Sequence, residues 1–318
     1  MTETLVSYSL LAVYSAMAIY TFAFIMFTID LARRSAPAPV ALKAPPVAVG
    51  KGGTALLDRL TTDAPADAAP KGPRFLRVAM GLTVIAWLLH VSAAVLRGLA
   101  AGRVPWANMF EFTLTATAII VGVFLAVQFW QDLRFLGAFI IGFALIALGI
   151  GTTNFYVDVV PLPPALQSYW LVIHVFVASL GTGFFAIGAA ISITQLLQAR
   201  REGGARSPKF LATLPTAEKL EVLAYRVIVV GFVFWTFTLI AGAIWAEHAW
   251  GRYWGWDTKE VWTFIIWVIF AGYIHARATR GWRGSRSAVL AIVGFCAVVF
   301  NFTIVNLFFK GLHAYSGL

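Results

Sequence analysis

The chain has little charge and almost no cysteine. Only 12% of its 318 residues are charged, while 60% are hydrophobic. Its single cysteine, Cys296, lies within an apolar run, so this chain alone can form no disulfide, CxxC redox pair or zinc site. A composition so poor in charge and so rich in apolar residues indicates an all-α polytopic membrane protein.

Eight apolar stretches are long enough to cross a bilayer core of roughly 30 Å, which takes about 20 helical residues. They predict transmembrane helices near residues 6–31, 76–98, 109–130, 134–152, 169–197, 223–247, 260–278 and 287–309. The segment 35–74 is rich in Ala and Pro and predicts a disordered cytoplasmic linker. It separates a first transmembrane helix at 1–34 from a seven-helix domain at 75–318. The segment that begins at Leu214 has a capping-type start, which predicts a short helix leading into the sixth span.

Lys and Arg residues are distributed unevenly between the two sets of connections. One set includes the basic segments 33–74, 200–219 and 277–286. The other set has little beyond Arg103, Arg252, Lys259 and Lys310. By the positive-inside rule the basic set is cytoplasmic, so both termini are predicted on the outer side, periplasmic or lumenal. These loops also explain the net charge of +10 without nucleic acid as a partner.

Tryptophan is concentrated in one predicted outer segment. Five of the twelve tryptophans lie within residues 242–262. Tryptophan favours the water–lipid boundary, but a belt role accounts for only one or two rings per helix end. An alternative explanation of the Trp cluster is an amphipathic helix that packs its aromatic rings at the membrane interface. Asp257 could likewise serve only as the N-cap of the seventh span. The density favours a platform for a large, flat, apolar ligand. Its residues are Trp245, Trp250, Tyr253, Trp254, Trp256, Asp257 and Trp262.

The five histidines lie at different predicted depths. His174, early in the fifth span, and His313, after the eighth, both lie near the outer surface. His275 is near the inner end of the seventh span, His90 is in the middle of the second, and His248 is within the Trp cluster. A lone histidine in a membrane is often satisfied by a neighbouring helix. Two histidines at the same depth, beside an aromatic platform, instead favour a porphyrin site in which His174 and His313 are the axial ligands of the iron.

These residues form a recognisable pattern. The segments 242–245 and 253–262 resemble the WWD signature of heme-handling proteins. The flanking sequence is similar to the CcsA (ResC) family, the membrane subunits of System II cytochrome c synthases. The similarity is specific from about residue 165 to the C-terminus and looser at 104–111. The flanking segments that carry it are 221–226, 267–277 and 301–313.

The resemblance implies a set of ligands for heme b. His174 and His313 match the family's two outer ligands of the heme iron, the only metal implied. His275 matches a ligand of a second, intramembrane heme site, completed by a companion CcsB (ResB) membrane protein. His248, which stands where the family commonly has Glu, and His90 are further possible ligands.

The resemblance also implies the reaction and its setting. Heme is moved to the outer WWD site and held there for thioether attachment to the CxxCH motif of apocytochrome c. No catalytic residue is separable from heme positioning. The implied partners are CcsB, apocytochrome c, thiol-reducing proteins and membrane lipid. The implied location is the bacterial inner membrane or the thylakoid membrane.

Two other functions are the main alternatives, besides a quinone-linked cytochrome b, which would need two intramembrane histidine pairs that this chain alone cannot form. One is a heme carrier that presents heme without ligating it. The other is a transporter of a non-heme amphiphile in which the histidines relay protons. The absence of carboxylates from the interior of the later spans disfavours the transporter.

Overall fold

The computed structural model describes residues 1–34, 74–162, 167–279 and 281–313, so the predicted linker lies outside the described residues, except for Arg74. Within these ranges eight helices are long and apolar enough to cross a membrane. This confirms the all-α polytopic fold and each of the eight predicted spans. The helices are α1 (Thr2–Arg34), α3 (Arg74–Ala101), α4 (Met109–Val127), α5 (Gly137–Asn154), α6 (Tyr169–Glu202), α7 (Ala217–Trp250), α8 (Thr258–Thr279) and α9 (Ser285–Phe302), continued after a break by α10 (Ile304–Phe308).

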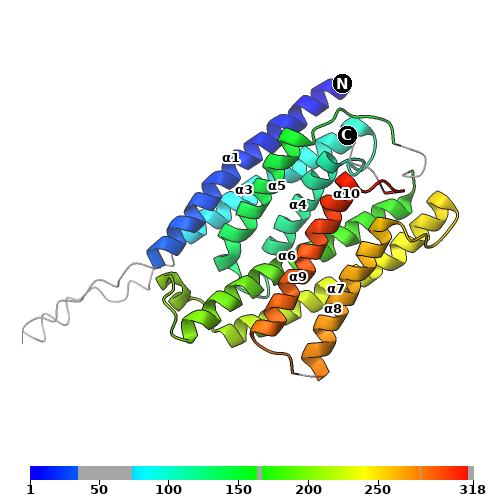
Figure 1. Ribbon diagram of the computed structural model, residues 1–318. Helices are drawn as coiled ribbons and strands as arrows, with labels where there is room; N and C mark the ends of the chain where they lie inside the picture. Colours follow the sequence, from blue (N-terminus) through cyan, green and yellow to red (C-terminus); the bar gives the residue numbers. More distant parts are fainter. Residues whose placement is uncertain (35–73, 163–166, 280, 314–318) are drawn as a thin grey trace, which may run out of the picture.

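Helices α1 and α3 lie side by side, as Figure 1 shows. Small residues at their interface are completely buried, among them Ala16, Ala86 and Ala93. Small side chains let two membrane helices approach closely, and hydrogen bonds between the helices add to that packing. Here the Ser9 hydroxyl donates to the Ala93 carbonyl at 2.8 Å. This pair packs on α4 and α5 through a shared apolar cluster.

A second apolar cluster joins α4 and α5 to α6, α7, α8 and α9. At its centre the rings of Phe185 and Phe270 stack with 3.6 Å between their centroids. A side chain at Gly294 on α9 would come within 2.7 Å of the Phe270 ring, so α9 approaches α8 closely only because this residue has no Cβ. The tight packing of these helices supports the site described below.

The sixth span is longer than its apolar run. Helix α7 begins at Ala217, where the Thr216 hydroxyl accepts the backbone N–H of Lys219, and continues without interruption to Trp250. The predicted capped start that leads into the sixth span is confirmed, but the helix is not a short one, because the same residues form the first turns of α7. A good N-cap followed directly by helix-forming residues gives no reason for a break.

Helix α1 begins and α10 ends at the same end of the bundle (Figure 1), as an even number of spans requires. The junction between α7 and α8 also lies at that end, because His313 after α10 hydrogen-bonds Asp257 before α8. We call this the Asp257 end. That it faces outward stays a prediction from the basic loops.

Candidate functional site

A cavity of about 390 Å³ lies among α4 to α10 near the Asp257 end. Its volume falls within the roughly 300–1,000 Å³ typical of small-molecule sites. The lining is mostly apolar, as expected for a site that binds an apolar body and fixes it with few polar groups. Of the five histidines, His174 and His313 line it.

His174 lies in the second turn of α6, and a hydrogen bond to α7 fixes its ring. Its Nδ1 lies 3.0 Å from the carbonyl oxygen of Thr238. A carbonyl can only accept, so Nδ1 carries the proton and Nε2 keeps its lone pair. The ring stacks on Trp245, with 5.8 Å between centroids and 18° between planes. A Cβ at Gly242 would lie 2.7 Å from the ring, so only glycine admits His174 there.

His313 follows α10 and is held by the Trp cluster. Its Nδ1 lies 2.8 Å from Oδ2 of Asp257, whose Oδ1 accepts the N–H of Leu312. The hydrogen bond from His313 holds the pKa of Asp257 below its ordinary value, so Asp257 is a carboxylate at neutral pH. In the hydrogen bond between the two residues, Nδ1 of His313 is therefore the donor and Asp257 the acceptor. The other ring nitrogen of His313, Nε2, has no partner among the described residues.

The two histidines share one aromatic ring. Trp245 lies 5.5 Å from the His313 ring and 5.8 Å from the His174 ring, measured between centroids. Trp250 contacts both Trp245 and His313, at 4.8 and 4.9 Å. The structure thus brings together the two histidines that the sequence paired by depth.

The remaining platform residues divide into two groups. Tyr253 and Trp254 line the cavity, as Trp245 does. Trp256 lies outside it with 76% of its surface exposed, although it touches the Trp254 ring edge-on. Trp262 packs against Phe300 of α9, with 4.4 Å between centroids, and does not line the cavity.

The other three histidines lie elsewhere. His90 is fully buried between α1, α3 and α4, with Nε2 2.8 Å from the Leu114 carbonyl and Nδ1 3.4 Å from the Tyr20 hydroxyl. His248 is exposed, and its Nδ1 bonds the Ile244 carbonyl of its own helix. His275 is exposed on α8, away from the cavity.

A tight turn presents the motif between α7 and α8. Gly251 ends α7 in the left-handed conformation that favours glycine. Trp256 also has a positive φ of 59°, which costs a non-glycine residue roughly 1–3 kcal/mol. The Glu260 carboxylate offsets this cost, because its Oε2 accepts the N–H groups of Gly255 and Asp257 at 2.8 and 3.0 Å. Asp257 accepts the Lys259 N–H as well, so the predicted capping role and the contact with His313 coexist.

Polar residues missed by the sequence reasoning complete the cavity wall. All six have a polar group and stand beside or within an apolar span, which is a signal visible in the sequence. It is clearest for the two asparagines of the eighth span. The six residues are Trp106, Asn108, Lys259, Glu260, Asn301 and Asn306.

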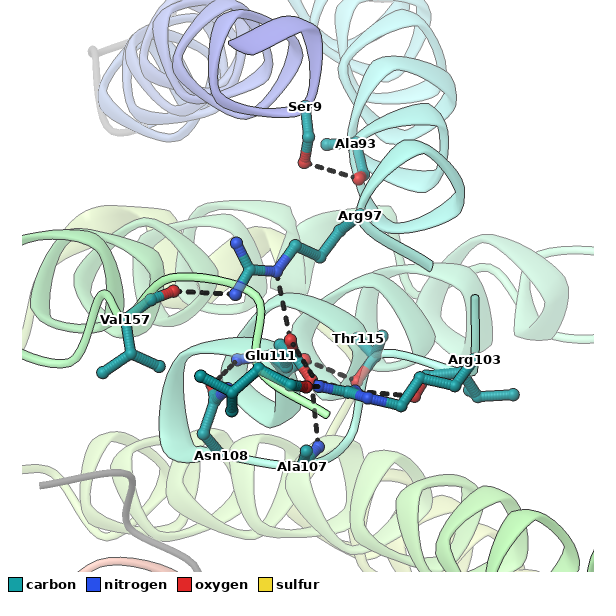
Figure 2. A network of polar contacts seen from close by, with 11 residues as sticks. Ser9, Ala93, Arg97, Arg103, Ala107, Asn108, Glu111, Thr115 and Val157 are labelled. Atoms are coloured by element: carbon teal, nitrogen blue, oxygen red, sulfur yellow. Dashed lines mark hydrogen bonds and ion pairs between the residues drawn. The ribbon is translucent and has the colours of Figure 1, made fainter. Parts of the chain in front are cut away.

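A buried charge network fixes the α3–α4 connection beside the cavity (Figure 2). Glu111, with no exposed surface, accepts from Arg97 at 3.1 Å and from Arg103 at 2.6 Å. It also accepts the Ala107 N–H, and its own N–H donates to the Asn108 side chain. The network holds Asn108 as the N-cap of α4, against the cavity.

Together these features define a class of protein: a multi-pass helical membrane protein with an aromatic cavity lined by two oriented imidazoles at one end of the bundle. Residues 106–313 match the family model described as cytochrome c assembly protein. The chain is 33% identical over 252 residues to the cytochrome c biogenesis protein CcsA of Trieres chinensis, covering 70% of this chain and 81% of that protein. It is 34% identical over 265 residues to the CcsA of Parasynechococcus marenigrum, covering 74% and 85%. The chain therefore belongs to the CcsA family of cytochrome c assembly proteins, as its motifs predict.

A solved structure extends the comparison to the fold. The cytochrome c heme lyase CcmF matches with a TM-score of 0.62 and 17% identity, over 94% of this chain and 46% of CcmF. At this identity the likeness concerns the fold alone, and the chain spans less than half the length of CcmF.

Proposed function

We propose that this protein is the membrane subunit of a cytochrome c synthase that receives heme b and holds it in the cavity at the Asp257 end. His174 and His313 are its axial ligands. The main support is that both rings have Nδ1 bonded to a protein oxygen, while neither Nε2 atom has a partner among the described residues and both rings line one cavity. Iron in heme accepts one axial nitrogen on each face. Family membership supports the same function.

The residues would act by positioning the substrate. Trp245 and Trp254 supply apolar surface for the porphyrin, and the two imidazoles fix its iron, so that the vinyl groups are presented at one place. Each thiol of a CxxCH motif then adds its S–H across a vinyl double bond: sulfur bonds one carbon and the proton goes to the other. Fixed geometry raises the effective concentration of the reacting groups, which by itself lowers the barrier.

One axial ligand must leave when the histidine of CxxCH takes its place. His174 lies on the long helix α6, whereas His313 lies on the short segment that follows α10. His313 is therefore the ligand that we propose is exchanged, because moving it displaces no membrane span. Its bond to Asp257 would hold it nearby while the product leaves.

The second heme site is also a proposal. His275 is exposed on α8 and has no side-chain partner among the described residues. We propose that its face of α8 meets a CcsB-type membrane protein, which supplies the other ligand. Heme would pass from that site to the cavity in a bacterial inner membrane or a thylakoid membrane.

An absorption spectrum of the purified full chain, alone and with a CcsB-type partner, tests the outer site. The wild-type protein should show the sharp reduced α and β bands of a bis-imidazole heme after dithionite. His174→Ala and His313→Ala should weaken them, and added imidazole should partly restore both the bands and cytochrome c maturation. His248→Ala is the matched control, since that ring lies outside the cavity.

The possible outcomes separate the functions. Unchanged spectra in both His174→Ala and His313→Ala would exclude these residues as ligands. Heme binding without any maturation activity, with the partner present, would identify a heme carrier. A chain without heme in either preparation would support a transporter of another amphiphile.

A further inference from the structure

One edge of the cavity carries a positive charge without a paired carboxylate. Lys259, in the first turn of α8, lines the cavity and donates to the side-chain oxygen of Asn306 on α10. Its charge interacts with that of Asp257, yet among the described residues no carboxylate lies within 4.0 Å of the ammonium group. A cation on an apolar wall is costly unless an anion or several hydrogen bonds accompany it.

Unused hydrogen-bond donors lie on the adjoining wall. The side-chain oxygen of Asn108 accepts the Glu111 N–H, which fixes the amide orientation and turns Nδ2 away from the helix end. Asn108 is 4% exposed and lines the cavity, and its Nδ2 has no hydrogen-bond partner among the residues that the structure describes. The indole N–H of Trp106, also on the lining, is buried and has no acceptor within the described part of the chain. A buried donor left unpaired costs roughly 1–3 kcal/mol, so each indicates a missing acceptor.

Side-chain contacts along the cavity lining connect Lys259 to the residue that follows Asn108. Asn306 links the two walls, because its side-chain amide donates to the sulfur of Met109, the residue after Asn108, while its oxygen accepts from Lys259. The Glu111 network shown in Figure 2 fixes the Asn108 side chain at the start of α4. Lys259, Asn306 and Met109, the neighbour of Asn108 in sequence, are therefore connected from α8 through α10 to α4.

We infer that Lys259, Asn108 and Trp106 form a subsite for a carboxylate group of the bound ligand. This inference rests on the proposed function, which makes the ligand heme, an iron porphyrin with two carboxylate side chains. The ammonium group supplies the charge and the two N–H groups supply directed hydrogen bonds, which are strongest when the acceptor is ionised. The subsite would set the rotation of the porphyrin in its plane, and hence which edge carries the vinyl groups toward apocytochrome c.

Two acceptors on the same cavity lining limit where a carboxylate can bind. Glu260 Oε1 and Asn301 Oδ1 are buried, and neither has a donor in residues 1–34, 74–162, 167–279 or 281–313. Glu260 is tied through its other oxygen to the turn at Gly255, and Asn301 donates to Thr263. An anion beside these oxygens would be repelled, so the carboxylate is directed to the edge that holds Lys259 and Asn108.

The test compares heme with its dimethyl ester, which keeps the iron, ring and vinyl groups and loses both negative charges. Binding is followed by absorption titration of the purified full chain. Wild-type protein should bind heme at least about tenfold more tightly than the ester, the size expected for a charge-assisted hydrogen bond. Lys259→Met should remove most of this preference by weakening heme binding alone. Lys310→Met, an exposed lysine beyond α10, should leave it unchanged.

Asn108→Ser is a second variant, because serine still caps α4 but lacks the amide donor. It should reduce the preference for heme by a few-fold. If wild-type protein binds heme and ester equally, or Lys259→Met weakens both equally, the carboxylate subsite is wrong while heme binding stands. If wild-type protein binds neither, the proposed function itself fails.

Discussion

Nδ1 of His313 lies 2.8 Å from Oδ2 of Asp257, which joins residues 56 positions apart in the sequence. This contact gives the acidic residue of the Trp-rich motif a specific role. Histidines that bind metals commonly donate their second ring N–H to a carboxylate, which fixes the tautomer and makes the ligating nitrogen more basic. Asp257 meets this description for His313, and the Thr238 carbonyl does so for His174. The motif and the two histidines therefore form one unit.

Asp257→Ala should weaken heme binding although both proposed ligands remain. Loss of such a supporting residue typically lowers metal affinity by about 10–100-fold. Absorption titration with heme measures the change, and added imidazole should recover part of the bis-imidazole spectrum. Asp158→Ala, an exposed aspartate before α6, is the control. Wild-type affinity in Asp257→Ala would mean that the hydrogen bond does not support ligation.

Gly242→Ala should disturb the site through His174 alone. The added methyl would lie 2.7 Å from the imidazole, so the ring must move from its place beside Trp245. The heme retained on purification should fall, with the helical content unchanged by circular dichroism. Gly272→Ala on α8 meets nothing within 4 Å and provides the matched control. Equal heme content in the two variants would show that the position of His174 is not critical.

Two neighbouring tryptophans should differ in effect. Trp254→Ala removes a cavity wall, whereas Trp256→Ala removes a ring that is 76% exposed and outside the cavity. We expect the first to lower the heme-to-protein ratio several-fold and the second to leave it nearly unchanged. Pyridine hemochrome absorbance per mole of purified protein gives this ratio. The reverse order would indicate that heme binds on the surface of the motif and not in the cavity.

Glu111→Gln should destabilise the protein. The substitution keeps the shape but leaves Arg97 and Arg103 without their shared anion in a buried position. Breaking a buried ion pair in this way typically costs about 3–5 kcal/mol. The apparent Tm of the detergent-solubilised protein should fall clearly. Asp132→Asn, which breaks an exposed pair with Arg134, should change it little. If Glu111→Gln and the wild-type protein had equal Tm values, water or another acceptor would have to replace the lost carboxylate.

The sequence by itself determined the eight spans and the position of the candidate site. Span length and apolar content are local properties, so each helix could be located without knowledge of its neighbours. The depth of His174 and His313 follows from the same count of residues along each span. The density of tryptophan in 242–262 likewise marked the motif before any contact was known.

Only the tertiary structure decided how each side chain is used. Membrane helices that are apolar on all sides give no periodic signal for the face that packs inward. The sequence therefore did not separate Trp254, on the cavity, from Trp262, packed on α9. Contacts between distant segments, such as Lys259 with Asn306 and Asp257 with His313, depend on how eight helices assemble. The local sequence determines how deep in the membrane a polar side chain lies. Only the packing of the helices determines which residues that side chain contacts.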